Sequence, residues 1–355
     1  MLDIKYSTIL KVAIPLMGSA FIQSLVMITD SAYLSRYSTV AFDSAGNGGM
    51  IYITMFVALM GLSDSSQIIM ARRIGEKRDN LIAQIFGTTL FSNLLIALLL
   101  FTLMQTTLPA MIDWFTNNKA IASGQKEFIS IRSYALFFAV ISLTVNAYLM
   151  AIGKTKLVLI GAVITACSNV ILDYSLIFGN LGGPELGLRG AALASTLADG
   201  GGMLFLATAL YFNKEGRKHQ LVKKMKINWD SFQNIFKVGT PIILQGTVGL
   251  IVWTIFFIMI EQMGTHELTV SQNIRSYYFL MFVPIWGFAG TTKTYVSQYI
   301  GNKDFASIKT IQRKIQIMSL VLLFISTHGA IFYPETLIAL INPDPAYLSE
   351  SANIL

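Results

Sequence analysis

Long apolar stretches separated by short polar connections run through most of the chain. Each stretch is long enough to cross a bilayer, because about 20 apolar residues at 1.5 Å per residue span the hydrocarbon layer. Glycine or proline marks many of their ends. We predict nine membrane-spanning helices, at residues 9–34, 46–71, 84–110, 128–151, 157–179, 189–212, 236–261, 272–299 and 312–333.

The composition agrees with this pattern. Hydrophobic residues make up 54% of the chain and charged residues only 13%, with a mean hydropathy of +0.60. Soluble globular proteins have about 25% charged residues. We therefore predict an all-α polytopic membrane protein, in which the net charge of +7 does not call for a nucleic-acid partner. The single cysteine, Cys167, excludes an intrachain disulfide. The first apolar stretch has no cleavage site of small residues, so we expect it to be a retained span.

Lysine and arginine residues gather on alternate connections. They precede the first predicted span and follow the second, fourth, sixth and eighth, and the largest group lies at 214–226. By the positive-inside rule, the N-terminus and the even-numbered connections are cytoplasmic. We expect a monomeric multi-pass protein of the inner (cytoplasmic) membrane.

The chain also repeats itself at a constant offset of 226 residues, the separation of Pro15 from Pro241. This offset superposes, among others, Pro15 on Pro241, Met55-Phe56-Val57 on Met281-Phe282-Val283, Gly61 on Gly287, and Ile74-Gly75 on Ile300-Gly301. Six spans in each repeat give the two repeats the same direction across the membrane. We therefore predict two six-helix lobes related by a pseudo-two-fold axis along the membrane normal, with a cavity between them.

The repeat also divides the chain. We predict an N-terminal lobe at 1–213, a basic cytoplasmic linker at 214–235 and a C-terminal lobe at 236–355. Under the same offset, the counterparts of spans four to six would fall beyond Leu355. About nine complete spans are thus expected, with the second lobe incomplete and the chain apparently truncated at its C-terminus. Such a chain is expected to insert into a membrane without transporting.

Polar side chains inside the first lobe are the main candidates for function. Asn169 and Asp173 lie four residues apart on the fifth predicted span, so they share one helix face. An acid in the bilayer costs about 2.5–3.5 kcal/mol on insertion scales, and it generally faces a cavity and has a function. Asp30 and Thr196 lie at a similar depth, and oxygen ligands suit a hard cation or a shared proton. Alternatively, the pair joins helices, Asp30 caps a helix and Thr196 bonds to its own helix.

A second polar set lies in the inner half. It comprises Asp64 and Gln67 on the second predicted span and Lys293 on the eighth. Two further residues lie outside this set: Asp199 extends the first polar set, and Gln245 is a weaker candidate for lining the cavity. We predict that Asp64 and Lys293 approach each other when the cavity is closed to the cytoplasm. In the alternative, Lys293 extends to the membrane interface.

Nothing in the sequence points to catalysis. The three histidines form no cluster with the spacing of metal ligands, and no nucleophile–histidine arrangement is evident. The chain has no Walker-type phosphate-binding loop, so it has no ATP motor of its own. We predict that it is not an enzyme.

Several motifs of the chain resemble those of the multidrug and toxic compound extrusion (MATE) family. The motifs are Ile14-Pro15 with Asp30, Ala71-Arg72-Arg73-Ile74-Gly75, Asn169 with Asp173, and Gly190-Ala191-Ala192 followed by Ala194-Ser195-Thr196. The resemblance implies two six-helix lobes and outward export coupled to entry of Na⁺ or H⁺. It also implies that Asp30, Asn169, Asp173 and Thr196 form the coupling site, where Na⁺ is a possible ligand. Some members carry an acid in the seventh span, but residues 245–250 contain none, so we place coupling in the first lobe.

We therefore predict a cation-coupled antiporter that exports small organic compounds, cationic or amphipathic, by alternating access. It would need no cofactor besides the coupling ion and no ATPase subunit. Two alternatives stay open. One is a lipid-linked oligosaccharide flippase of the same superfamily, which would need basic residues in the cavity; the other is a polytopic scaffold or membrane enzyme.

Overall fold

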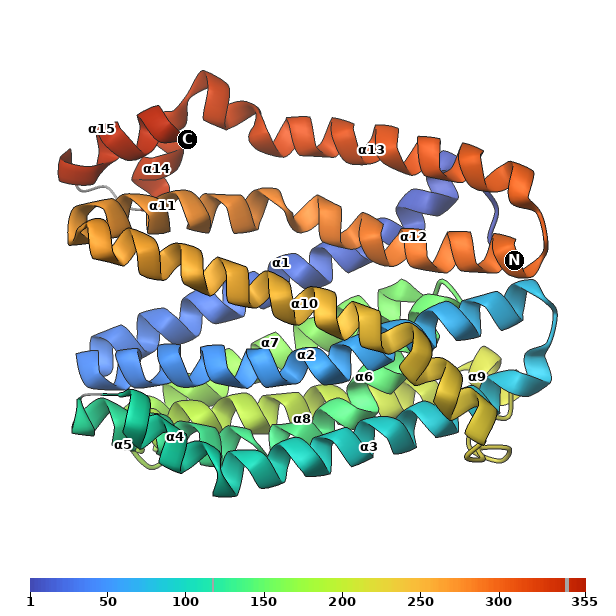
Figure 1. Cartoon of the computed structure of the whole chain (residues 1–355), viewed down its shortest axis with the longest axis horizontal. Coiled ribbons are helices and arrows are strands. Elements are labelled where there is room, and N and C mark those ends of the chain that lie inside the picture. Colours follow the sequence, from blue (N-terminus) through green and yellow to red (C-terminus); the bar gives the residue numbers. More distant parts are fainter. Residues whose placement is uncertain (117, 342–344) are drawn as a thin grey trace.

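The computed structural model describes residues 1–116, 118–341 and 345–355, and within these ranges every regular element is a helix (Figure 1). The all-α prediction is therefore confirmed. The α-helices are α1 (Tyr6–Tyr37), α2 (Thr39–Gly75), α3 (Ile82–Thr106), α4 (Leu108–Phe115), α5 (Lys119–Arg132), α6 (Ala135–Ala151), α7 (Thr155–Phe178), α8 (Leu188–Phe212), α9 (Lys214–Lys218), α10 (Trp229–Met263), α11 (Thr265–Met281), α12 (Val283–Gly301), α13 (Phe305–Phe332), α14 (Pro334–Ile341) and α15 (Pro345–Ile354).

Most of the predicted spans are recovered, and two of them are broken. Among the described residues, seven helices are long and apolar enough to cross a membrane, and the bent pair α5–α6 makes an eighth span. The span predicted at 128–151 is wrong as a single helix, because α5 and α6 meet at an angle of 48°. The span predicted at 272–299 is divided between α11 and α12, where Pro284 in the first turn of α12 can donate no backbone hydrogen bond.

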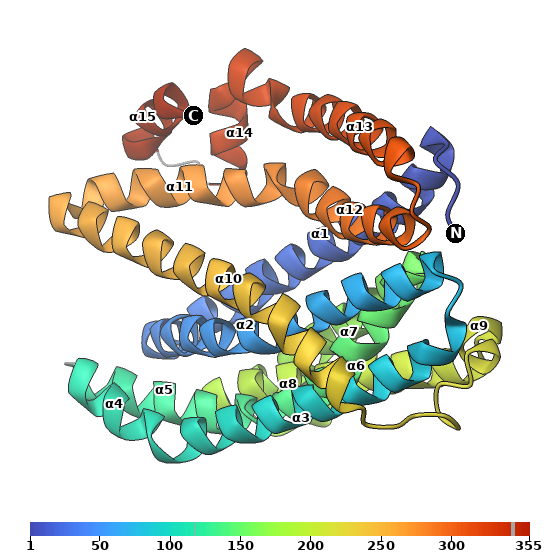
Figure 2. The ribbon, with the colours of Figure 1, turned by 45° about the vertical axis from the view of Figure 1, so that its right-hand side comes forward.

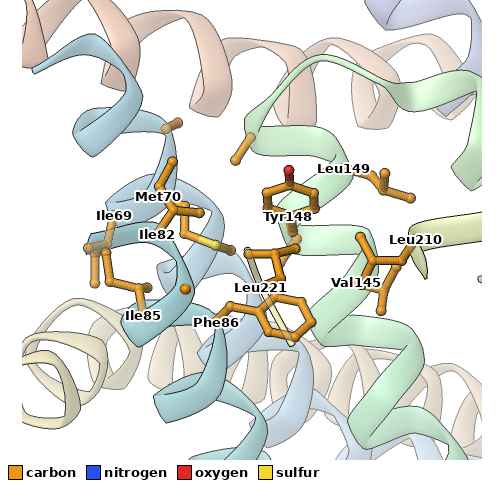
Figure 3. Packing of buried hydrophobic residues seen from close by; sticks show 14 of the residues in the cluster. Ile69, Met70, Ile82, Ile85, Phe86, Val145, Tyr148, Leu149, Leu210 and Leu221 are labelled. Carbon is orange, nitrogen blue, oxygen red and sulfur yellow. The ribbon is translucent and has the colours of Figure 1, made fainter. Parts of the chain in front are cut away.

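The largest hydrophobic core lies in the first lobe (Figure 3). Ile69 and Met70 of α2 and Phe86 of α3 pack there with Tyr148 of α6, and Leu221 of the linker closes the cluster. Burying side chains of this size contributes about 1.5–3 kcal/mol each in water, and in a membrane close packing takes over part of that role. The core fixes α2, α3 and α6 as one unit.

The first helix of each lobe also packs on a helix of the other lobe. The C-terminal end of α2 packs on α12, while α10 packs on α2 and α1 packs on α12. The glycines at these contacts are related by the repeat. A Cβ atom on Gly61 would overlap Ile243, and a Cβ atom on Gly287 would overlap Met17. The repeat offset carries Gly61 onto Gly287 and Met17 onto Ile243, so the two contacts are equivalent. The predicted pseudo-two-fold relation is therefore present in the packing itself.

The same relation recurs where the lobes meet most closely. A Cβ atom on Gly75 would overlap the backbone carbonyl of Gln298, and one on Gly301 would overlap the backbone carbonyl of Arg72. Glycine is required at both positions because the helices approach backbone to backbone. This end of the bundle, which also holds the N-terminus, the α6–α7 turn and α9, is called the basic end below (Figure 1).

Hydrogen bonds seal the basic end. Gln298 donates from Nε2 to the carbonyl of Ala151 (2.8 Å), Thr294 donates to the carbonyl of Met150 (2.9 Å), and Oε1 of Gln298 accepts from the Leu2 backbone (2.9 Å). In the part of the chain that the structure describes, all side-chain hydrogen bonds between the lobes lie between Asp64 and this end. Figure 2 shows α11 and α4 well separated at the opposite end. Among the described residues, the hydrogen-bonded contact between the lobes is thus confined to the part of the bundle from Asp64 to the basic end.

The connection between the lobes is docked on the first lobe. His219 is 7% exposed, and its Nδ1 lies 2.7 Å from the hydroxyl of Tyr148 on α6. The Asn228 backbone donates to Thr88 of α3 (3.1 Å), and Asn228 caps α10. The predicted linker therefore ends too late, because Trp229 to residue 235 are already helical, and it is not wholly a solvated strip. Burial holds the pKa of His219 below its usual value.

Candidate functional site

Two acids and an amide meet inside the first lobe. Asp30 comes from α1, and Asn169 and Asp173 come from one face of α7, as their spacing predicted. Asn169 is 2% exposed and Asp173 is fully buried. The carboxyl groups of Asp30 and Asp173 lie close enough to share a hydrogen bond when one of them carries a proton. We call these three residues the acidic pocket.

Four of the five side-chain oxygens of the acidic pocket have no hydrogen-bond donor. Oδ1 of Asp30, Oδ1 of Asn169 and both carboxylate oxygens of Asp173 are buried, and none of the four has a partner. Asn169 instead uses its amide nitrogen, which donates to Ser195 Oγ of α8 (3.2 Å). A buried acceptor without a donor costs about 1–3 kcal/mol, and more if it is charged. Four such atoms at one place fit a bound cation or a shared proton.

A largely buried arginine, with 14% of its side chain exposed, lies beside the acidic pocket. Arg132, at the end of α5, donates from Nη1 to Oδ2 of Asp199 (2.9 Å) and lies over the ring of Tyr52, 4.7 Å from its centre. Its charge also acts electrostatically on Asp30 and Asp173. The site therefore combines three acids with one fixed cation, and full ionisation leaves it two negative charges.

Thr196 contacts Arg132 and not the residues of the acidic pocket. Its hydroxyl donates to the carbonyl of Ala192 one turn back (2.7 Å), which is the local bond considered as its alternative role, and it lies 3.5 Å from Nη1 of Arg132. No hydrogen bond connects Thr196 to the acidic pocket among the described residues. Its predicted part in cation binding stays a prediction.

A second polar contact joins the lobes. Lys293 of α12 donates from Nζ to Oδ2 of Asp64 on α2, 2.6 Å away. One turn along α2, Gln67 donates from Nε2 to the carbonyl of Gly290 and to Thr294 Oγ1, both at 2.9 Å. Asp64 and Lys293 are thus in contact, so Lys293 does not extend to the interface in this state. That this contact belongs to a state closed to the cytoplasm stays a prediction. Gln245 lies exposed on α10, and its part in lining the cavity stays a prediction.

The residue of the candidate site that sequence reasoning missed is Arg132. The predicted fourth span, 128–151, already contained it, and an arginine inside a span is rare enough to mark a functional region. It was overlooked because it lies near the span end, where basic residues ordinarily reach the interface. The bend between α5 and α6 instead turns it inward, toward Asp199.

The atoms that the acidic pocket offers to a ligand limit what it can bind. Carboxylate and amide oxygens favour hard cations, and soft metals prefer sulfur or imidazole. Among the described residues, no group of three or more histidine, cysteine or acidic side chains is arranged to hold a metal. The oxygen atoms of the pocket suit a hard cation or a proton.

Two pseudo-symmetric lobes, closed at one end and holding buried unpaired acids, define a membrane transporter. The MatE family model matches residues 15–175 and 241–355, and the two matches begin at prolines that the repeat offset superposes. The chain therefore belongs to the MatE family of transporters.

Relatives and solved structures agree with this assignment. A probable multidrug resistance protein NorM of Thermotoga maritima is 28% identical over 97% of this chain and 74% of its own length. A multidrug resistance MATE transporter in an outward-facing conformation superposes with a TM-score of 0.86, at 18% identity, over 98% of this chain and 76% of its own. A MOP superfamily transporter from Pyrococcus furiosus, described as having a binding pocket of reverse polarity, superposes with a TM-score of 0.85, at 18% identity, over 97% of this chain and 76% of its own. The fold is thus shared by transporters of different pocket polarity.

Proposed function

We propose that this fold serves cation-coupled export of organic compounds, with the acidic pocket as the coupling site. The observation that carries the proposal is the set of four buried oxygens without donors on Asp30, Asn169 and Asp173. A Na⁺ ion or a proton at these atoms would satisfy them. Its arrival would also remove the repulsion between two neighbouring carboxylates.

The coupling is proposed to work through α1. Asp30 lies on α1, which packs on α7 of its own lobe and, like α2, also packs on α12 of the second lobe. A cation that draws Asp30 and Asp173 together changes how α1 lies against α7. The same helix carries the change to the contact between the lobes, so binding favours one lobe arrangement.

The substrate class follows from the surroundings of the acidic pocket. Ile22, Val26 and Thr29 of α1 and Val170 of α7 line an apolar groove of about 450 Å³ between the two helices that carry the acids, although the acids themselves do not line it. A groove of this kind supports an amphipathic substrate, and the acids support a cationic one. The name of the Thermotoga relative, a probable multidrug resistance protein, agrees with export of varied compounds.

The direction of transport rests on the orientation of the bundle. The positive-inside rule makes the basic end cytoplasmic, so the state described here is closed to the cytoplasm, with the Asp64–Lys293 pair as part of that gate. The flippase alternative is less well supported, because its candidate basic residue, Lys293, is held in an ion pair.

A binding measurement tests the coupling site without requiring transport. The chain in nanodiscs is titrated with Na⁺ at constant ionic strength, and separately with acid, while its thermal unfolding is followed. Stabilisation that is lost in Asp173→Asn and Asp30→Asn supports the proposal. Vesicles with Na⁺ and pH gradients imposed separately then show which ion drives dye efflux. Variants that respond to both cations like the wild type would contradict the assignment.

A further inference from the structure

A basic pocket opens on the molecule where the two lobes meet. It has a volume of about 580 Å³ and lies between the α2–α3 and α12–α13 connections, which are equivalent in the repeat. Lys77 and Lys303 occupy equivalent positions, and both adopt a left-handed backbone, with φ of 58° and 59°. Each lobe thus contributes one lysine, at positions that the repeat superposes.

The charges that line this pocket do not balance. Its basic residues are Arg72, Lys77, Arg78 and Lys303, and its only acid is Glu76. Glu76 already accepts hydrogen bonds from Arg72 (3.1 Å) and Arg73 (2.5 Å), and it lies 3.9 Å from Arg78. Among the described residues neither Lys77 nor Lys303 lies within ion-pair distance of an acid. The lining carries a formal charge of +3.

Glu76 itself keeps its charge in these surroundings. Partial burial would raise the pKa of this carboxyl group, but the hydrogen bonds and charges of Arg73 and Arg72 outweigh that effect and hold the pKa below its usual value. Glu76 therefore fixes the orientation of the arginines while neutralising only one of them. The remaining positive charge faces the pocket.

We propose that this pocket binds a phosphate-bearing anion between the two lobes. Arginine and lysine side chains are the groups that bind phosphate most strongly, and the volume exceeds that of a single phosphate group. An anion that contacts both Lys77 and Lys303 holds the lobes together at the contact made by Gly75 and Gly301. Binding therefore stabilises the state that is closed at the basic end.

The positive-inside rule explains why basic residues occur at this end, and it does not explain this arrangement. Lys223 and Lys224 of the linker are also basic, but they are exposed and do not line the pocket. They provide a matched control, because replacing Lys223 and Lys224 changes the net charge of the chain by the same amount as replacing Lys77 and Lys303.

The test uses two sources of phosphate. In the first arm, the chain in zwitterionic nanodiscs is titrated with inorganic tripolyphosphate and its thermal unfolding is recorded. In the second arm, the nanodiscs contain phosphatidylglycerol and no tripolyphosphate. A saturating anion is expected to raise the unfolding temperature by about 5 °C, and the effect should weaken as salt increases. A response in the first arm indicates a soluble phosphate compound, and a response in the second arm alone indicates a lipid headgroup.

The variant Lys77→Asn with Lys303→Asn should lower the affinity at least tenfold in the responding arm. Asparagine is chosen because it tolerates the left-handed backbone. The control, Lys223→Asn with Lys224→Asn, should retain the wild-type affinity, and the unfolding temperatures without anion show whether either variant is damaged. The proposal is overturned if the wild type responds in neither arm, or if control and pocket variants lose the same affinity.

Discussion

Lys293 on α12 and Asp64 on α2 form an ion pair of 2.6 Å between the two lobes, although 229 residues separate them in the sequence. Both side chains are about one-third exposed, at 32% and 29%. Gln67 lies one turn from Asp64 and bonds to α12 on either side of Lys293. The pair is therefore part of a continuous polar contact that begins the seal of the basic end.

Breaking this ion pair should weaken the closed basic end. Asp64→Asn or Lys293→Gln removes one charge and leaves the other without a partner between the lobes. We expect each to lower the unfolding temperature, and a double-mutant cycle to give a coupling energy of about 1 kcal/mol. The exchange Asp64→Lys with Lys293→Asp should recover part of the loss. A coupling energy of zero would show that the pair does not hold the lobes together.

The reciprocal glycine contacts predict equal effects at two distant positions. Gly75→Ala and Gly301→Ala each place a methyl group against a backbone carbonyl, which cannot rotate away. We expect each to destabilise the protein by about 1–3 kcal/mol, measured by unfolding in nanodiscs. Gly49→Ala on α2 is the matched control, because a Cβ there meets no atom within 4 Å. An effect at one glycine and none at the other would contradict the two-fold relation.

Arg132 should weaken cation binding at the acidic pocket. Its charge repels an incoming cation near Asp30 and Asp173, so Arg132→Gln should raise the affinity for the coupling ion on the order of tenfold. The substitution Arg132→Gln leaves Asp199 without its partner. Adding Asp199→Asn removes this extra negative charge, so the gain in cation affinity should then be smaller. The measurement is the cation concentration that gives half-maximal thermal stabilisation. A lower affinity in Arg132→Gln would mean that the arginine helps to build the pocket.

Docking of the interlobe linker should weaken in acid. Burial and the neighbouring Lys218 lower the pKa of His219 from its ordinary value of 6.5, while Asp79 and Glu215 oppose this effect. Because the docked form binds the proton less well than the released form, docking is full above pH 6.5 and is lost as the pH falls below it.

Tryptic cleavage of the linker measures this effect. Cleavage after Lys218, Lys223 or Lys224 should become faster between pH 7.5 and 5.5 in the wild type. His219→Gln cannot titrate in this range, so it corrects for the pH dependence of the protease. If both proteins show the same pH dependence, His219 does not control docking.

The sequence was sufficient for the features that depend on local pattern. The spacing of Asn169 and Asp173 gives their shared face directly, and depth along the helices brought Asp30 to the same level. The repeat offset carries Gln67 onto Lys293, so Asp64 and Lys293 lie on equivalent spans of opposite lobes, and this placement led to the prediction that they approach each other. These inferences need only helical geometry and symmetry.

Other features depend on bends and packing that hydropathy does not record. An apolar count over 128–151 cannot detect the 48° turn between α5 and α6, and that turn decides whether Arg132 faces the interface or the lobe interior. Pro284 was a visible signal for the break before α12. His219 looked like part of a solvated basic strip because its partner, Tyr148, is 71 residues away.

The reciprocal contacts of Gly75 and Gly301 also bear on ancestry. Residue 72 of one half touches residue 301 of the other, and residue 298 touches residue 75, which is the pattern of a two-fold homodimer interface. The chain therefore keeps, between its own halves, a surface by which two copies of a single half could have paired before gene duplication joined them. Since that duplication, a side chain gained in one half has had to be accommodated by the other.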